Sequence, residues 1–234
     1  AAGADVIEVG VPYSDPLADG PTIQEAAARA LEKGVTLEDV LAMLTKLKQR
    51  RESGVDGAAS EMAPIVMFTY YNPILKMGID TFCARAKECG ASGLLVPDLP
   101  IEETGPIRSA ATSAGLELVL LVTPTTPKPR MSLIAEASQG FVYLVSLAGV
   151  TGARAKVAAN VEQLIGDMHD ATSKSVAVGF GVSKPEQAKQ IKDWGAEGVI
   201  VGSALVKLLG ESGSTAEGLK NLREKTRALK KAIQ

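Results

Sequence analysis

The sequence predicts an α/β fold made of repeated strand–helix units, as in a (β/α) barrel or a doubly wound sheet. Short apolar runs alternate with amphipathic helical patterns along the whole chain of 234 residues. The runs are continuous and rich in branched side chains, which is typical of parallel strands buried on both faces. The units repeat at a period of roughly 25–40 residues, and no linker divides the chain. We therefore expect one α/β domain over residues 1–234.

Seven apolar runs are candidate strands, one fewer than a complete TIM (β/α)8 barrel needs. They are Val6–Val9, Ile65–Thr69, Leu94–Val96, Leu116–Val122, Phe141–Ser146, Val176–Val178 and Gly198–Val201. The chain opens on Ala1-Ala2-Gly3, which resembles the last turn of a helix whose body is absent. We therefore expect a TIM barrel that lacks its first strand–helix unit.

Helix boundaries are marked by short local signals. Thr36 and Asp39 have the spacing of a capping box at the start of an amphipathic run, and Pro185 opens another helix. Three glycines, each directly before a candidate strand, are predicted to end the preceding helix with a left-handed residue: Gly3, Gly90 and Gly195.

Composition excludes several classes of function. The net charge of −2 gives no electrostatic bias toward nucleic acid or an anionic membrane, and no apolar run approaches the length of a membrane span. Cys83 and Cys89 are spaced so that their side chains do not meet on one helix, which indicates reduced, buried thiols. His169 is the single histidine, so a Ser/His/Asp triad and a multi-histidine metal site are excluded, and no metal is expected.

Three carboxylates lie close together in the first part of the chain. Glu8 interrupts an apolar strand, and Asp15 and Asp19 follow in a Pro/Asp/Gly loop. A buried acidic residue is costly unless it is paired, neutralised or used chemically. A loop-anchoring salt bridge would explain a lone glutamate, but a second carboxylate on a short loop is the layout that general acid/base catalysis needs.

Three glycine-bearing turns follow late strands and predict a phosphate site. They are Gly149–Gly152, Gly179–Ser183 and Gly202–Ala204. Glycine lets the backbone approach an anion, and the first turn of a helix offers free N–H groups. Barrels often bind phosphate with the last two loops and a short extra helix, for which the segment from Ser203 to Leu209 has the right size. Any one of these turns alone could simply close a loop.

Six motifs, in this order along nearly the whole chain, resemble those of the tryptophan synthase alpha subunit family. They are VIEVGVPYSDPLADGPTIQ (Val6–Gln24), FTYYNP (Phe68–Pro73), VPDLP (Val96–Pro100), YLVSLAGVTG (Tyr143–Gly152), GFGVSKP (Gly179–Pro185) and GVIVGSALVK (Gly198–Lys207). They are closest to plant and algal members, which include stand-alone indole-3-glycerol-phosphate lyases. The resemblance implies a retro-aldol cleavage of indole-3-glycerol phosphate to indole and glyceraldehyde 3-phosphate in tryptophan biosynthesis, without a cofactor in this chain.

The resemblance also assigns roles by motif. Glu8 would be the general acid/base, Asp19 would bind the indole N–H, and Tyr143 would orient the substrate. The substrate pocket would be lined by Ile23, Tyr70, Leu95, Thr151 and Phe180, and the phosphate would be bound by Gly152, Gly181, Gly202 and Ser203. For both tyrosines and for the apolar residues, core packing is an alternative explanation. Leu147 stands where many bacterial members carry arginine, so lid closure is expected to differ.

The family docks on a beta subunit that carries pyridoxal phosphate, in an alpha2beta2 assembly. The segments that match its docking surface are Asp15–Pro16, Asn72–Pro73 and Pro100. A stand-alone lyase of specialised metabolism and a catalytically silent activator of a beta subunit are alternatives. A sugar-phosphate isomerase barrel would explain the glycine turns but not the pairing of Glu8 with Asp19. The expected compartment is the plastid stroma for a plant or alga and otherwise the cytoplasm.

Overall fold

The computed structural model describes residues 2–53, 63–145, 154–179 and 181–234. It divides into two compact units. The N-terminal unit contains residues 4–118, and the C-terminal unit contains residues 119–234 together with residues 1–3.

The N-terminal unit contains three parallel strands whose order follows the chain, with β1 beside β2 and β2 beside β3. Its elements are β1 (Ile7–Gly10), α1 (Pro21–Glu32), α2 (Leu37–Glu52), β2 (Ile65–Phe68), α3 (Tyr71–Met77), α4 (Ile79–Glu88), β3 (Gly93–Leu95), η1 (Ile101–Glu103) and α5 (Gly105–Ala114). Helices α4 and α5 pack against each other, and each has buried apolar side chains, among them Phe82 and Ile107.

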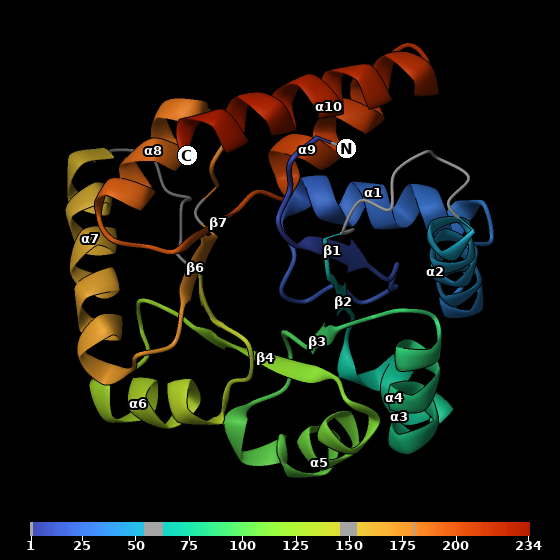
Figure 1. Cartoon of the computed structure of the whole chain (residues 1–234), viewed down its shortest axis with the longest axis horizontal. Coiled ribbons are helices and arrows are strands. Elements are labelled where there is room, and N and C mark those ends of the chain that lie inside the picture. The colour runs from blue at the N-terminus through green and yellow to red at the C-terminus, as the bar shows by residue number, and fades with distance from the viewer. Residues whose placement is uncertain (1, 54–62, 146–153, 180) are drawn as a thin grey trace. The chain divides into compact units, whose positions relative to one another are not determined.

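The C-terminal unit continues with four strands, again parallel and in chain order. Its elements are β4 (Glu117–Val122), which begins at the end of the first unit, α6 (Lys128–Ala137), β5 (Val142–Val145), α7 (Arg154–Ala171), β6 (Val176–Gly179), α8 (Pro185–Asp193), β7 (Gly198–Ile200), α9 (Ser203–Glu211) and α10 (Thr215–Ala232). Within this unit α6, α7 and α8 follow one another along one side of the strands, and α10 lies along α8 and α9 (Figure 1).

All seven predicted strands are present within a residue or two of their expected bounds, so the α/β class is confirmed. The inner strands β2, β3 and β4 are largely buried, as their apolar runs predict. The prediction of burial on both faces is wrong for β1, where Ile7 is 37% exposed and Glu8 is exposed as well. The physical reason is that β1 pairs only with β2 among the described strands, which leaves its other edge open.

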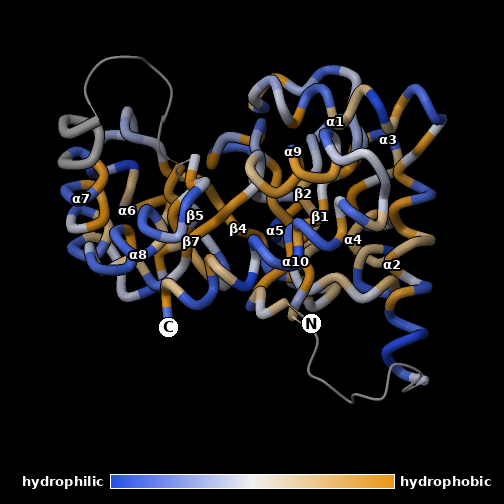
Figure 2. Tube along the Cα trace, turned by 90° about the horizontal axis from the view of Figure 1, so that it is seen from above, coloured by the Kyte–Doolittle hydropathy of each residue, from blue (hydrophilic) through white to orange (hydrophobic). Residues whose placement is uncertain are grey.

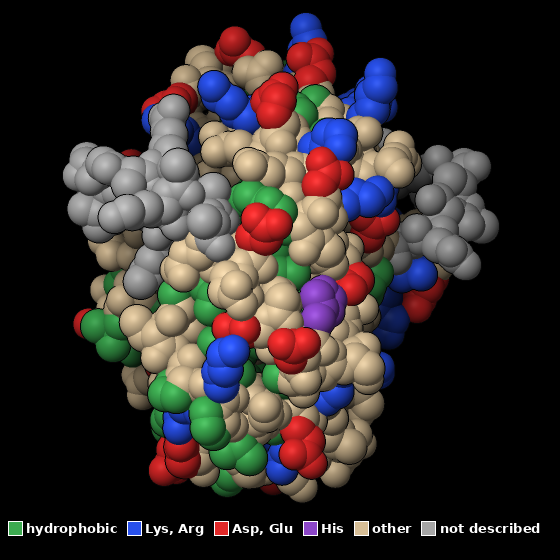
Figure 3. Space-filling view, turned by 90° about the vertical axis from the view of Figure 1, so that its left-hand side faces the viewer, with side chains coloured by type: hydrophobic (Ala, Val, Ile, Leu, Met, Phe, Trp, Pro, Cys, Tyr) green, Lys and Arg blue, Asp and Glu red, His purple; other side chains and the backbone are tan. Residues whose placement is uncertain are grey.

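Apolar residues concentrate along the strands and on the strand-facing sides of the helices (Figure 2). The outer surface carries interspersed acidic and basic side chains (Figure 3), including the pairs Lys128–Asp167 at 2.8 Å and Lys189–Asp193 at 2.7 Å. Both cysteines are buried free thiols, and His169 lies on α7, as expected. No helix in the described ranges is both long and apolar enough to cross a membrane.

The local signals for helix boundaries are confirmed. The Thr36 hydroxyl accepts a hydrogen bond from the Asp39 N–H, and the Asp39 carboxylate accepts one from the Thr36 N–H, which completes the capping box. Pro185 is the first residue of α8. Gly90 and Gly195 follow the ends of α4 and α8 with φ angles of 99° and 104°, which other residues rarely adopt, so these two joints between helix and strand depend on glycine. Gly3 has a similar φ of 98°, but no helix precedes it among the described residues.

Candidate active site

Glu8 lies in β1, in register with Val66 of β2. Part of its side chain is accessible to solvent, yet protein surrounds the carboxylate closely enough to remove much of its hydration. This burial, together with the negative charge of Asp19, raises the pKa of Glu8 to about 7. A glutamic acid with this pKa can both donate and accept a proton near neutral pH.

Asp19 lies in the loop between β1 and α1, where local hydrogen bonds fix the backbone. Its N–H donates to the Pro16 carbonyl at 3.1 Å, and its own carbonyl accepts from the Gln24 amide at 2.8 Å. The Tyr70 hydroxyl donates to Asp19 Oδ2 at 2.9 Å. Burial raises the pKa of Asp19, and the hydrogen bond from Tyr70 opposes that rise because it stabilises the ionised carboxylate.

Tyr70 joins the loop to the core of the N-terminal unit. It directly precedes α3, and its side chain is only 2% exposed. Besides donating to Asp19, its hydroxyl oxygen accepts the Ala18 N–H at 3.0 Å. Burial is the main reason that the pKa of Tyr70 is raised, and the hydrogen bond to Asp19 adds to it. The structure thus brings together two predicted site residues that are 51 positions apart in the chain.

The two predicted apolar pocket residues of this unit differ in their surroundings. Ile23 lies in the first turn of α1 and is half-buried. Leu95 ends β3 and is fully buried in the core. Leu95 therefore has the packing role that its sequence position also allowed, whereas the Ile23 side chain is partly accessible.

Tyr143 lies within β5, between Leu121 of β4 and Ala177 of β6 in the strand register. Its ring lies over Gly179, the last residue of β6. A methyl group at Gly179 would come within 2.6 Å of the Tyr143 hydroxyl, so any side chain there would force the ring to move.

The predicted phosphate-binding residues are described only in part. Gly202 precedes α9 and Ser203 begins it, and both are exposed at a helix N-terminus, where backbone N–H groups point toward solvent. Gly181 has a φ of 56°, in the region that favours glycine. Thr151, Gly152 and Phe180 lie outside the described residues.

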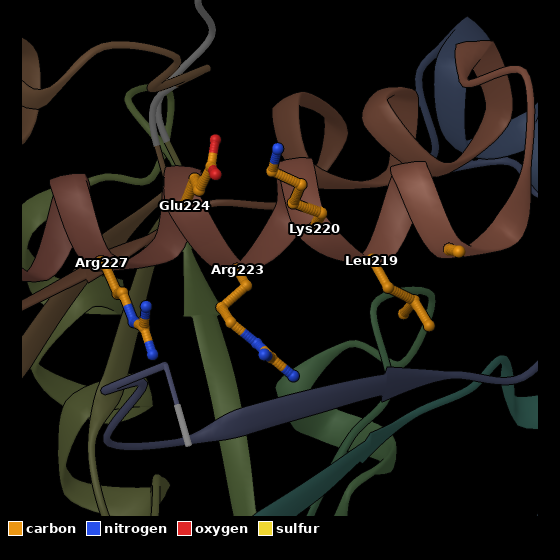
Figure 4. A pocket seen from close by; sticks show the side chains of 6 residues that line it. Leu219, Lys220, Arg223, Glu224 and Arg227 are labelled. Atoms are coloured by element: carbon orange, nitrogen blue, oxygen red, sulfur yellow. The ribbon is translucent and has the colours of Figure 1, made fainter.

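A hollow of about 310 Å³ lies along α10 (Figure 4). Its walls are formed by Ala216, Leu219, Lys220, Arg223, Glu224 and Arg227. Arg223, Arg227 and Leu219 point to one side of the helix, and Lys220 and Glu224 to the other. None of the predicted site residues lines this hollow. Across the described stretches, no three or more His, Cys, Asp and Glu side chains gather in a way that could hold a metal ion.

The sequence profile of the family described as "Tryptophan synthase alpha chain" matches residues 1–234. The chain belongs to the tryptophan synthase alpha chain family. It is 57% identical to the tryptophan synthase alpha chain of the cyanobacterium Picosynechococcus over all of its own length and 84% of the relative. The Arabidopsis thaliana alpha chain is 53% identical over the whole of this chain and 81% of the relative.

Solved structures agree with this assignment. The tryptophan synthase complex of Pyrococcus furiosus contains a chain with a TM-score of 0.83 and 38% identity, matched over 97% of this chain and 86% of that one. The alpha subunit from Legionella pneumophila gives a TM-score of 0.86 at 33% identity, over 99% and 82% of the two chains. The predicted TIM-barrel class is thereby confirmed, with seven strands in the described part of the chain.

Membership of the tryptophan synthase alpha chain family establishes the activity. The chain is a lyase that cleaves indole-3-glycerol phosphate to indole and glyceraldehyde 3-phosphate in tryptophan biosynthesis. This family uses no cofactor in the alpha chain, and pyridoxal phosphate belongs to the beta subunit.

Two residues at the alpha-chain site were not singled out from the sequence. Tyr13 stacks on Tyr70 with ring centroids 5.1 Å apart, and Asp98 accepts the Tyr71 N–H at the start of α3 at 3.0 Å. Both lie in motifs that were recognised, directly after β1 and β3, where the carboxyl ends of parallel strands place functional groups. Their positions directly after two strands could have identified them as candidates. The residues that they contact could not be predicted from the sequence.

Proposed function

We propose that Glu8 and Asp19 carry out the cleavage together. Glu8 donates its proton to the indole ring carbon that bears the glycerol chain, and Asp19 stabilises the positive charge that develops on the indole N–H. Glu8, now ionised, then accepts the proton of the glycerol hydroxyl next to the breaking carbon–carbon bond. The bonding electrons return to the indole ring, the hydroxyl carbon becomes the aldehyde of glyceraldehyde 3-phosphate, and Glu8 regains its proton.

The observation that carries this proposal is the difference between the two carboxylates. Glu8 has a pKa of about 7, so both of its protonation states are populated at neutral pH. Asp19 receives a hydrogen bond from Tyr70, which favours its charged form. An environment that gives two neighbouring carboxylates different protonation states is typical of an acid/base residue beside an electrostatic stabiliser.

The remaining predicted residues hold the substrate in this proposal. Tyr143 orients the glycerol chain, with its ring position fixed by Gly179. Ile23, Tyr70, Thr151 and Phe180 surround the indole ring while Leu95 packs in the core, and Gly152, Gly181, Gly202 and Ser203 bind the phosphate. The exposed N-terminus of α9 supports the last part, because unpaired N–H groups and the helix dipole favour an anion.

We further propose that the chain docks on a tryptophan synthase beta subunit in an alpha2beta2 assembly. The docking surface contains the Asp15–Pro16 loop, Asn72–Pro73 and Pro100. Leu17 lies beside that loop with its side chain 86% exposed, so a partner docked there would bury it. The matched structure from Pyrococcus furiosus is itself a tryptophan synthase complex.

The proposed compartment depends on the source of the chain. Relatives of comparable similarity come from a plant and from cyanobacteria. We propose the plastid stroma if the source is a plant or alga, and the cytoplasm otherwise.

Indole release from indole-3-glycerol phosphate tests these roles, measured with and without a beta subunit. Glu8→Gln is expected to abolish cleavage while the circular dichroism spectrum stays unchanged, because the amide cannot transfer the proton. Glu32→Gln is the matched control, since Glu32 lies exposed at the end of α1, outside both the proposed site and the docking surface, and this variant is expected to retain turnover. Near-full turnover by Glu8→Gln would overturn the acid/base role.

Activity without the beta subunit would favour a stand-alone lyase, and activity only with it would favour the synthase assembly.

A further inference from the structure

We propose that Tyr13 is a positioning residue for the cleavage reaction: its ring holds Tyr70 in place, and Tyr70 in turn orients the carboxylate of Asp19. The inference rests on the proposed role of Asp19 and adds a residue that contacts neither the indole nor the phosphate in that proposal. The contacts among Tyr13, Tyr70 and Asp19 on which the inference rests all lie within the N-terminal unit.

The Tyr70 hydroxyl has two hydrogen-bond partners whose directions are fixed. The backbone N–H of Ala18 can only donate, so the phenolic oxygen accepts that bond at 3.0 Å. The phenolic proton is therefore directed to Asp19 Oδ2 at 2.9 Å. Both partners belong to the loop after β1, so one hydroxyl fixes the backbone of the loop and its carboxylate together. This pair of bonds exists only while the Tyr70 ring keeps its orientation.

Two other aromatic rings contact the Tyr70 ring and restrain its orientation. Tyr13 stacks on it at 5.1 Å with an angle of 29° between the ring planes. Phe68 meets it edge to face at 6.3 Å and 85°. Phe68 belongs to β2 and is held by the sheet, whereas Tyr13 comes from the loop that carries Asp19. Tyr13 therefore adds a ring contact between Tyr70 and this loop to the two hydrogen bonds of the Tyr70 hydroxyl.

Tyr13 is itself anchored at its outer end. The Asn72 side-chain amide donates to the Tyr13 hydroxyl at 3.2 Å. Asn72 lies in the first turn of α3, directly after Tyr70 and Tyr71, so Tyr13 is held against the helix that begins beside its stacking partner. The stacked ring and its hydroxyl thus both connect the loop to α3.

The chemical consequence concerns the charge of Asp19. The hydrogen bond from Tyr70 lowers the pKa of Asp19 against the effect of burial. If Tyr13 no longer restrains Tyr70, this hydrogen bond is populated for less of the time and the pKa of Asp19 rises. A smaller fraction of the enzyme then carries the charge that stabilises the indole nitrogen, and the acidic limb of the pH profile moves to higher pH.

Three variants test the inference in the full chain with its beta subunit. Tyr13→Leu removes the stacked ring and is expected to lower kcat by about threefold to tenfold, the range expected for one aromatic pair, with little change in KM. Its acidic limb is expected to shift upward. Tyr13→Phe keeps the ring and is expected to stay within about twofold of wild type, since an exposed hydrogen bond contributes little. Tyr13→Met, of similar volume, replaces Tyr13→Leu if that variant does not fold.

The double variant Tyr13→Leu/Tyr70→Phe separates positioning from general loss of packing. If Tyr13 acts through the Tyr70 hydroxyl, adding Tyr13→Leu to Tyr70→Phe shifts the acidic limb no further. Equal shifts in both backgrounds would overturn the inference, as would an unchanged kcat and pH profile for Tyr13→Leu alone.

A second readout does not depend on turnover. Carbon-13 NMR of the Asp19 carboxyl, assigned with Asp19→Asn, measures its pKa directly. Tyr13→Leu is expected to raise this pKa and Tyr13→Phe to leave it unchanged; an unchanged value in Tyr13→Leu overturns the inference. Failure of the proposed role of Asp19 looks different, because Asp19→Asn would then keep near-full turnover while the NMR comparison still decides the role of Tyr13.

Discussion

The ring of Tyr143 occupies the space that a side chain at Gly179 would need. A methyl group built at Gly179 lies 2.6 Å from the Tyr143 hydroxyl oxygen and 2.8 Å from a ring carbon, well inside van der Waals contact. The two residues lie on neighbouring strands, β5 and β6, so neither backbone can move away without disturbing the ladder. The glycine is therefore required by its neighbour and not by its own φ angle.

Gly179→Ala is expected to destabilise the fold by about 1–3 kcal/mol through overpacking, and to raise KM because the ring of Tyr143 is displaced. Urea denaturation and steady-state kinetics measure the two effects. Gly166→Ala is the matched control: this glycine is in the exposed part of α7 with open space around it, and alanine is expected to stabilise that helix by about 0.5–1 kcal/mol. Wild-type stability and KM in Gly179→Ala would contradict the packing argument.

The dependence of kcat/KM on pH is expected to be bell-shaped. Cleavage requires Glu8 to enter with its proton, so activity falls as pH rises through about 7, the pKa of Glu8. It also requires ionised Asp19, so activity falls again at low pH, below the raised pKa of that group. A profile that is flat through about pH 7 would exclude Glu8 as the proton donor of the free enzyme.

Glu8 also gives the folding free energy a pH dependence. Its pKa is higher in the folded chain than the ordinary value of 4.5, so the folded state binds the proton more tightly than the unfolded state. The stability of wild type relative to Glu8→Gln is therefore expected to be greatest below pH 4.5 and to fall as pH rises to about 7. Urea denaturation of both proteins across this range gives the difference, and a difference that is constant or grows with pH would be inconsistent with the raised pKa.

Asp98 stabilises the start of α3, which has no cap from the side chain at its own N-cap position. Its two carboxylate oxygens accept the Tyr71 N–H at 3.0 Å and 3.2 Å. Asp98→Ala is expected to cost about 1 kcal/mol, as for the loss of an N-cap. Asp98→Asn keeps an acceptor and is expected to lose less. Thermal unfolding measures both, and equal stability of Asp98→Ala and wild type would show that the bond contributes nothing.

Much of the fold could be predicted because its signals are local. The inner strands follow from continuous apolar runs, the start of α2 from Thr36 and Asp39, and the helix ends from Gly90 and Gly195. The exposure of β1 could not be predicted in this way. A run such as Val6–Val9 has the same composition whether one or two strands flank it, so its burial depends on neighbours that the run does not encode.

In the candidate site, too, features that depend on local sequence could be predicted, and features that depend on distant contacts could not. Residue type and spacing point to the carboxylates Glu8, Asp15 and Asp19, and the family resemblance assigns the catalytic roles to Glu8 and Asp19. The link from Tyr13 through Tyr70 to Asp19 depends instead on the path of a loop and on a contact between residues 51 positions apart. The location of Leu95 could not be predicted from its residue type. An apolar residue at a strand end is equally suited to a pocket and to the core, and here it is fully buried.

The glycines that precede β1, β3 and β7 matter for the design of chimeric proteins. Gly3, Gly90 and Gly195 share nearly the same φ angle and each leads into a strand within a few residues. A crossover placed at such a glycine leaves the backbone direction into the strand unchanged, whichever relative supplies the preceding helix. Gly90 and Gly195, which each lie between a helix and a strand, are therefore natural exchange points for building chimeras with relatives, whereas a crossover between Tyr13 and Tyr70 would separate two side chains that have to be inherited together.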